Sequence, residues 1–200
     1  AGVGVAVDRL SDRAEARSRL NLPADVEIVL VISGSGGTGT PTAPLTIGAR
    51  ADAAGTWITI GEIASQWHET PPWNMRHAGW VNNPADWIAA ADRIISSCGN
   101  TTAHMVGATD KPWIVPEWRY FDEQLCKAHT LGREREAACC EHWPSCAESW
   151  RAMWECAQHF DRGARTRLVA HDPAEEAATW LDILASSLWA GADRPVMPAG

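Results

Sequence analysis

Short runs of β-branched and aliphatic residues alternate with longer helical segments over most of this chain. The run at residues 26–33 (Val-Glu-Ile-Val-Leu-Val-Ile-Ser) is apolar at nearly every position, as strands buried inside parallel sheets are. Parallel strands that are separated by helices join as right-handed βαβ units. The pattern therefore predicts an α/β fold with a doubly wound parallel sheet of about six strands.

The expected elements can be placed by residue number. Strands are predicted at 26–33, 56–60, 75–81, 93–97 and 113–115, and helices at 12–20, 43–54, 83–91, from 100 onward, 122–140, 147–160 and 173–189. Among the tryptophans, we expect Trp57, Trp87 and Trp180 at core positions and Trp150 packed with Trp154 on one helix face.

The charge of the chain limits its partners. Its 17 Lys and Arg stand against 25 Asp and Glu, which gives a formal net charge of −8. Because nucleic-acid binding needs a basic patch, we expect no nucleic-acid partner. No apolar stretch approaches the length of a membrane span and no signal-peptide pattern opens the chain, so the sequence predicts a soluble, cytoplasmic protein.

Two turns after predicted strands have the composition of a phosphate site. The first, residues 33–39, is glycine-rich, so a ligand can approach its backbone closely. It lacks the lysine of a P-loop and the acidic partner of a dinucleotide site. The second, residues 96–102, opens a helix with Asn100, Thr101 and Thr102, and a helix N-terminus attracts anions. A plain tight turn and an ordinary helix cap are the alternative interpretations.

Carboxylate and amide side chains also surround an aromatic cluster at residues 116–124. Glu123 and Gln124 can bind hydroxyl groups, and aromatic rings pack on the C–H faces of sugars. A solvated helix start with acidic residues in its first turn is the alternative interpretation.

Taken in order, these pieces carry a resemblance. They are the turn at 33–39, Gly79-Trp80-Val81, the segment 91–96 (Ala-Asp-Arg-Ile-Ile-Ser), Cys98-Gly99-Asn100-Thr101-Thr102, the segment 111–116 (Lys-Pro-Trp-Ile-Val-Pro) and Asp122-Glu123-Gln124. Over residues 26–130 the chain resembles the C-terminal, donor-binding half of GT-B nucleotide-sugar glycosyltransferases. Similar patterns occur in the peptidoglycan N-acetylglucosaminyltransferase and in plant and macrolide glycosyltransferases.

The resemblance implies a role for each matching residue. The fold would be a Rossmann-like half of a GT-B enzyme, with residues 1–24 as a linker helix, 25–190 as the nucleotide-sugar-binding domain and 191–200 as a flexible tail. The implied contacts are Trp80 and Val81 to the base, Gly34, Ser35, Gly36, Ser97, Gly99, Asn100, Thr101 and Thr102 to the diphosphate, His104 to the ribose, and Glu123 and Gln124 to the donor sugar. One position departs from the family, because Met105 stands where a ribose-binding glutamate is usual.

The resemblance also implies an activity. It is transfer of a hexosyl group, most simply from a UDP-sugar, to an acceptor hydroxyl, without a cofactor or metal. Both inversion and retention of configuration stay open, and the resemblance favours inversion. The acceptor domain and catalytic base would lie outside this chain, on an N-terminal domain or a separate subunit through which the protein could also associate with a membrane surface. We therefore expect the isolated chain to bind donor but not to transfer sugar.

Two other functions remain open. Met105 and the missing base fit a non-catalytic nucleotide-sugar-binding or scaffolding partner. A third hypothesis is a zinc-binding α/β protein, because thiols and imidazoles gather in the C-terminal third of the chain. The residues concerned are Cys139, Cys140, His142, Cys146, Cys156 and His159. Their spacing matches no Cys-x-x-Cys knuckle, and buried free thiols behave as small apolar residues.

Overall fold

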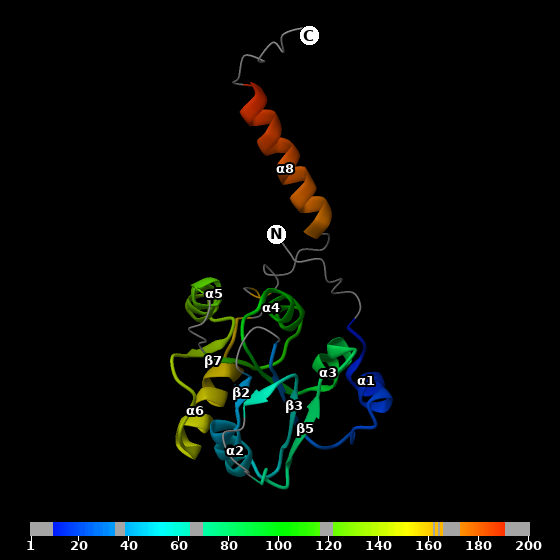
Figure 1. Ribbon diagram of the computed structural model, residues 1–200, viewed down its shortest axis with the longest axis vertical. Coiled ribbons are helices and arrows are strands. Elements are labelled where there is room, and N and C mark those ends of the chain that lie inside the picture. Colours follow the sequence, from blue (N-terminus) through cyan, green and yellow to red (C-terminus); the bar gives the residue numbers. More distant parts are fainter. Residues whose placement is uncertain are drawn as a thin grey trace.

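The computed structural model describes residues 10–34, 39–64, 70–116, 122–161, 163, 165 and 173–190. Its main sheet has six parallel strands in the order β5-β3-β1-β6-β7-β8, and a small second sheet pairs β2 with β4 (Figure 1). The strands are β1 (Ile28–Ile32), β2 (Thr40–Pro41), β3 (Thr56–Ile60), β4 (Ile63–Ala64), β5 (Met75–Gly79), β6 (Arg93–Ser96), β7 (Trp113–Pro116) and β8 (Ala138–Cys140). The predicted doubly wound α/β fold is confirmed.

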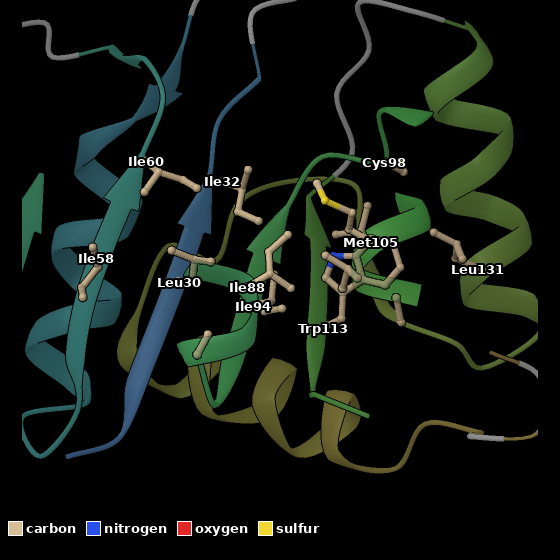
Figure 2. Close-up of a cluster of buried hydrophobic side chains, with 14 of the residues drawn as sticks. Leu30, Ile32, Ile58, Ile60, Ile88, Ile94, Cys98, Met105, Trp113 and Leu131 are labelled. Atoms are coloured by element: carbon tan, nitrogen blue, oxygen red, sulfur yellow. The ribbon is translucent and has the colours of Figure 1, made fainter. Parts of the chain in front are cut away.

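Helices cover both faces of the sheet. Leu30 of β1 joins a core cluster with residues of α3 (Pro84–Ala90), α4 (Asn100–Gly107) and α5 (Asp122–Arg133), part of which is drawn in Figure 2. Val29 and Val31, on the opposite face of the same strand, join a second cluster with α2 (Thr42–Ala51) and α6 (Ala147–Gln158). This alternation explains why β1 is apolar at every position, since both of its faces are buried.

The second cluster is built around tryptophan. The ring centroids of Trp57 and Trp150 lie 5.3 Å apart in an edge-to-face arrangement, and Trp150 stacks on Trp154 at 6.5 Å. Aromatic pairs prefer such geometries to a face-to-face sandwich. The core positions predicted for these three residues are confirmed, and Trp87 packs partly buried against the first cluster.

Helix α1 (Arg13–Arg19) packs against α3, and its Arg17 side chain is only 2% exposed. The guanidinium donates to the carbonyls of Pro23, Ala24, Val26 and Ala90 and forms an ion pair of 2.6 Å with Asp92. Asp92 also accepts a hydrogen bond from the amide of Ile28, the first residue of β1. Through these contacts α1 is joined to the start of the sheet.

The helix predicted over residues 122–140 is wrong in its second half. Helix α5 ends at Arg133, Arg135 takes a positive φ of 58°, and β8 pairs with β7 as the sixth strand. Small apolar residues such as Ala137 and Ala138 fit a helix or a strand equally well by their pattern. Pairing with the open edge of β7 decides the outcome, because it satisfies backbone groups that an edge strand leaves free.

Helix α8 (Pro173–Ala190) stands apart from the sheet, as its orange-to-red ribbon shows in Figure 1. Trp180 is 60% exposed, so the core position predicted for it is wrong. Leu181, Ile183, Leu188 and Trp189 are exposed as well. Among the described residues, no helix combines the length and apolar character needed to cross a bilayer.

Candidate functional site

The site predicted from the sequence lies at the carboxyl edge of the main sheet. Because all six strands are parallel, the segments that follow β1, β3, β5, β6 and β7 meet at this edge. Gly34, Trp80, Ser97 and Gly99 all lie in such segments. The structure therefore brings the predicted residues from separate parts of the chain to one edge.

Backbone hydrogen bonds around Gly61 connect the segments that follow β1, β3 and β5. The Gly61 amide donates to the carbonyl of Gly79 at 2.8 Å, and the amide of Ser33 donates to the carbonyl of Ile60 at 2.9 Å. Gly61 has a φ of +88°, and a Cβ atom placed on it would lie 1.9 Å from the carbonyl oxygen of Ser33. Only glycine fits there without displacing the backbone that follows β1.

The far end of the glycine-rich turn is fixed by the small sheet. Thr40 and Pro41 of β2 pair with Ile63 and Ala64 of β4, which directly follows Gly61 and Glu62. The turn is thus anchored at Ser33 on one side and at Thr40 on the other. Ser35 and Gly36, both predicted to contact the diphosphate, lie outside the described residues.

Gly34 and Gly99 differ from Gly61, because neither packing nor conformation requires glycine at these positions. A Cβ atom on either residue would meet no atom of the described structure within 4 Å. Neither has a positive φ, and Gly99 has φ −58°. Open space above two glycines at one sheet edge is what a ligand that approaches the backbone needs.

Helix α4 begins beside Gly99 without a capping side chain. Gly99 is the N-cap residue and no side-chain hydrogen bond caps this end of the helix, so the ordinary side-chain cap is wrong as an interpretation. The first helical residues are Asn100 and Thr101, both exposed, and Thr102, which is half-buried. Uncapped N–H groups and the helix dipole together favour an anion at this end.

Helix α5 meets the start of α4 through a residue that sequence reasoning missed. The Lys127 ammonium donates to the amide oxygen of Asn100 and to the Glu123 carboxylate. Cys98 also contacts α5, since its thiol donates to the carbonyl of Gln124 at 3.1 Å. Glu123 and Gln124, the predicted sugar-binding pair, therefore lie beside the predicted diphosphate site. The four-residue spacing of Glu123 and Lys127 was the available signal.

The predicted base-binding residues lie at the other side of the same edge. Trp80 follows β5 and is 65% exposed, whereas Val81 packs partly against the first core cluster. Strand β5 is separated from β6 by β3 and β1, which at the usual strand spacing is about 14 Å. Base and phosphate groups of one ligand would thus lie along the edge rather than over a single strand.

No protein-family model and no curated protein matches this sequence. The fold, however, is similar to that of solved glycosyltransferases. The glycosyltransferase SnogD from Streptomyces nogalater is 21% identical, with a TM-score of 0.55 over 82% of this chain and 45% of that one. Sucrose-phosphate synthase from Thermosynechococcus elongatus is 19% identical, with a TM-score of 0.61 over 94% of this chain and 52% of that one. The spinosyn rhamnosyltransferase SpnG, complexed with thymidine diphosphate, is 17% identical, with a TM-score of 0.51 over 72% and 41%.

This chain spans about half the length of the structures that it matches. Its six-stranded parallel sheet with helices on both faces matches one Rossmann-like half of the GT-B fold. The chain has the fold of a Rossmann-like half of a GT-B glycosyltransferase.

His104 and Met105, the two residues for which the resemblance raised the question of ribose binding, are both buried. Met105 packs in the first core cluster, near Trp113 and Cys98 as Figure 2 shows. A glutamate placed there would bury a carboxylate among apolar side chains, at a large desolvation cost. His104 is 6% exposed, and its Nε2 atom has no hydrogen-bond partner among the described residues. That nitrogen is a polar group in α4 that the described protein leaves unsatisfied.

The zinc hypothesis finds no support in the described residues of this chain. They contain no group of three or more His, Cys, Asp and Glu side chains that could hold a metal ion. None of the six cysteines forms a disulfide: Cys98 is buried, Cys139 and Cys140 are half-buried, and Cys126, Cys146 and Cys156 are exposed.

Two of these thiols should make the stability of the protein sensitive to alkaline pH. Burial raises the pKa of Cys98 to about 11 and that of Cys139 to about 12, from an ordinary value of 9.0. Between pH 9 and 11 the unfolded chain therefore loses thiol protons that the folded chain keeps, so stability falls as pH rises. We expect the unfolding free energy of the wild type to fall more steeply over this range than that of a Cys98→Ala, Cys139→Ala variant.

Urea unfolding at pH 8, 9.5 and 11 measures this slope. The pKa of Lys111, which burial lowers to about 8, acts in the opposite direction but is present in both proteins and cancels in the comparison. If the unfolding free energies of wild type and variant fell in parallel with pH, the pKa values of the two thiols would be the same in the folded and unfolded states, and the prediction would be wrong.

Proposed function

We propose that this chain is the donor-binding half of a GT-B glycosyltransferase and binds a nucleoside diphosphate sugar at the carboxyl edge of its sheet. The observation that carries the proposal is that no atom of the described residues lies within 4 Å of a Cβ placed on Gly34 or Gly99. Neither glycine is required there by packing within the described structure or by a positive φ. The uncapped start of α4 beside Gly99 supplies backbone N–H groups for the diphosphate. The likeness to glycosyltransferases supports the fold, and the site supports the ligand class.

In this proposal the chain assists the departure of the diphosphate. Negative charge grows on the bridging phosphate oxygen as the bond to the sugar breaks, and the N–H groups of α4 are already directed toward that charge. Exposed Trp80 would pack on the base, and Glu123 and Gln124 would hold hydroxyls of the hexose. The acceptor and the general base would come from an N-terminal domain or a separate subunit, so the proposal predicts binding without transfer by this chain alone.

Calorimetric titration of the chain with UDP, GDP and dTDP tests the proposal. UDP is the expected ligand, and dTDP is included because SpnG was solved with thymidine diphosphate. A sugar-bound form, UDP-glucose or UDP-N-acetylglucosamine, should bind more tightly than UDP if Glu123 and Gln124 contact the hexose. If none of the diphosphates binds, the proposal is wrong, and the scaffolding function becomes the better explanation of the core position of Met105.

A matched pair of variants places the diphosphate. Asp and Asn have the same shape and are both favourable N-cap residues, so Gly99→Asp and Gly99→Asn should fold as stably as the wild type. The carboxylate of Gly99→Asp would repel a diphosphate at the start of α4. We expect Gly99→Asp to bind UDP at least tenfold more weakly than Gly99→Asn, an effect of about 1.4 kcal/mol or more. Equal affinities would place the diphosphate elsewhere.

A further inference from the structure

The ion pair between Lys127 and Glu123 joins the proposed diphosphate and sugar subsites. Both residues lie on α5, and the Lys127 ammonium also donates to Asn100 in the first turn of α4. The Lys127 side chain is 31% exposed and that of Glu123 is 58% exposed, so the pair faces solvent and neither charge is locked in the core. The Lys127 ammonium lowers the pKa of the Glu123 carboxyl, which holds it in the ionised form.

Three other cations of the described structure make their contacts at the opposite, amino-terminal edge of the sheet. Arg17 contacts Asp92 just before β6, and Arg93 at the start of β6 pairs with Glu27 and Asp52. Lys111, just before β7, donates to backbone carbonyls at the end of α3. Among the described residues, Lys127 is the cation that contacts the first turn of α4. This matters because the chain carries a net charge of −8 and the proposed ligand is itself an anion.

We infer that the donor diphosphate displaces Glu123 as the partner of the Lys127 ammonium, and that the released Glu123 carboxylate then accepts hydrogen bonds from the hydroxyls of the sugar. This inference rests on the proposed function and adds an order to it. In the free protein the Glu123 carboxylate pairs with the Lys127 ammonium, so neither charge is left unpaired in the empty site. In the complex the Lys127 ammonium donates to the phosphate oxygens instead. The Glu123 carboxylate is then able to accept hydrogen bonds from the hexose beside it. The exchange couples the two subsites through one ion pair.

The test compares binding of UDP and of uridine to three variants. Lys127→Met removes the charge but keeps much of the aliphatic stem, and we expect about tenfold weaker UDP binding with uridine affinity unchanged. Glu123→Gln removes the competitor of the phosphate, so UDP should bind several-fold more tightly. Arg133→Met is the matched control, because it removes a positive charge from the last turn of the same helix at an exposed position. Its UDP affinity should stay within twofold of the wild type.

The outcomes separate the inference from the proposed function. If the wild type binds UDP and Lys127→Met binds it equally well, the inference is overturned while the donor site stands. If Lys127→Met and Arg133→Met weaken UDP binding by the same factor, the effect is general electrostatics and the inference is again overturned. Failure of the wild type to bind any of UDP, GDP and dTDP overturns both. Tighter UDP binding by Glu123→Gln, together with a lost preference for UDP-glucose over UDP, supports the exchange directly.

Discussion

A Gly61→Ala variant is expected to lose about 3 kcal/mol or more of its free energy of unfolding. A Cβ atom at this position would lie 1.9 Å from the carbonyl oxygen of Ser33, and φ is +88°. The left-handed conformation alone costs a non-glycine residue about 1–2 kcal/mol, and the clash with a backbone atom adds to that cost. Since the amide of Gly61 also donates to the carbonyl of Gly79, relief of the clash would disturb the ends of β1, β3 and β5 together.

Urea unfolding followed by circular dichroism measures this loss. Gly34→Ala is the matched control, because its Cβ meets no described atom within 4 Å and its φ is not positive. The control should unfold within about 1 kcal/mol of the wild type. Equal midpoints for Gly61→Ala and Gly34→Ala would show that the segment after β3 does not approach Ser33 as closely as described.

The second large effect is expected at Arg17. Arg17→Met would leave the Asp92 carboxylate without its buried partner and four backbone carbonyls without a donor. Breaking one side of a buried charge pair costs about 3–5 kcal/mol, so the variant should be strongly destabilised or unfolded at room temperature. Arg13→Met is the matched control, because Arg13 pairs with the same carboxylate but is 46% exposed. Exposed ion pairs contribute about 1 kcal/mol or less.

The acid side of the stability curve reports on the same cluster. Burial raises the pKa of Asp92, but the Ile28 amide and the Arg13 and Arg17 guanidiniums outweigh it, so the pKa lies below its ordinary value of 3.8. The stabilisation is therefore fully present only above about pH 5, and it is lost as pH falls through the ordinary pKa and then the lower pKa of the folded state. Thermal unfolding between pH 2 and 5 should show a shallower acid limb in any Arg17 variant that still folds, and an unchanged limb would argue against the pairing.

The central strands could be predicted from the sequence almost to the residue. Ile28–Ile32 and Thr56–Ile60 are apolar runs between turn residues, and burial of both faces leaves no other element that fits them. The helix predicted for residues 138–140 is wrong, because three small residues carry no periodicity and the free edge of β7 decides their conformation. Trp180 was misplaced because an amphipathic pattern shows that a helix has an apolar face, not what the face contacts.

For the candidate site, the sequence predicted the glycines and the start of α4 but not Lys127. Gly34 and Gly99 follow strands, and every strand of a parallel sheet ends at the same edge, so their proximity follows from the fold class. Lys127 is 27 positions from Asn100, and only the packing of α5 beside α4 brings the two side chains together. The four-residue spacing in the sequence predicts the pair of Glu123 and Lys127, but it does not predict the contact of Lys127 with Asn100.

The distribution of tryptophan gives this protein two spectroscopic populations. Trp57, Trp113 and Trp150 are shielded from solvent, so their emission should be blue-shifted and insensitive to soluble quenchers. Trp80 and Trp180 face water, so their emission should lie at longer wavelength and be quenched by iodide or acrylamide. With 12 tryptophans and one tyrosine, excitation selects the indole rings almost exclusively. Red-edge fluorescence can thus follow the surface around β5 and α8 while the blue edge follows the core, in a single sample and without a label.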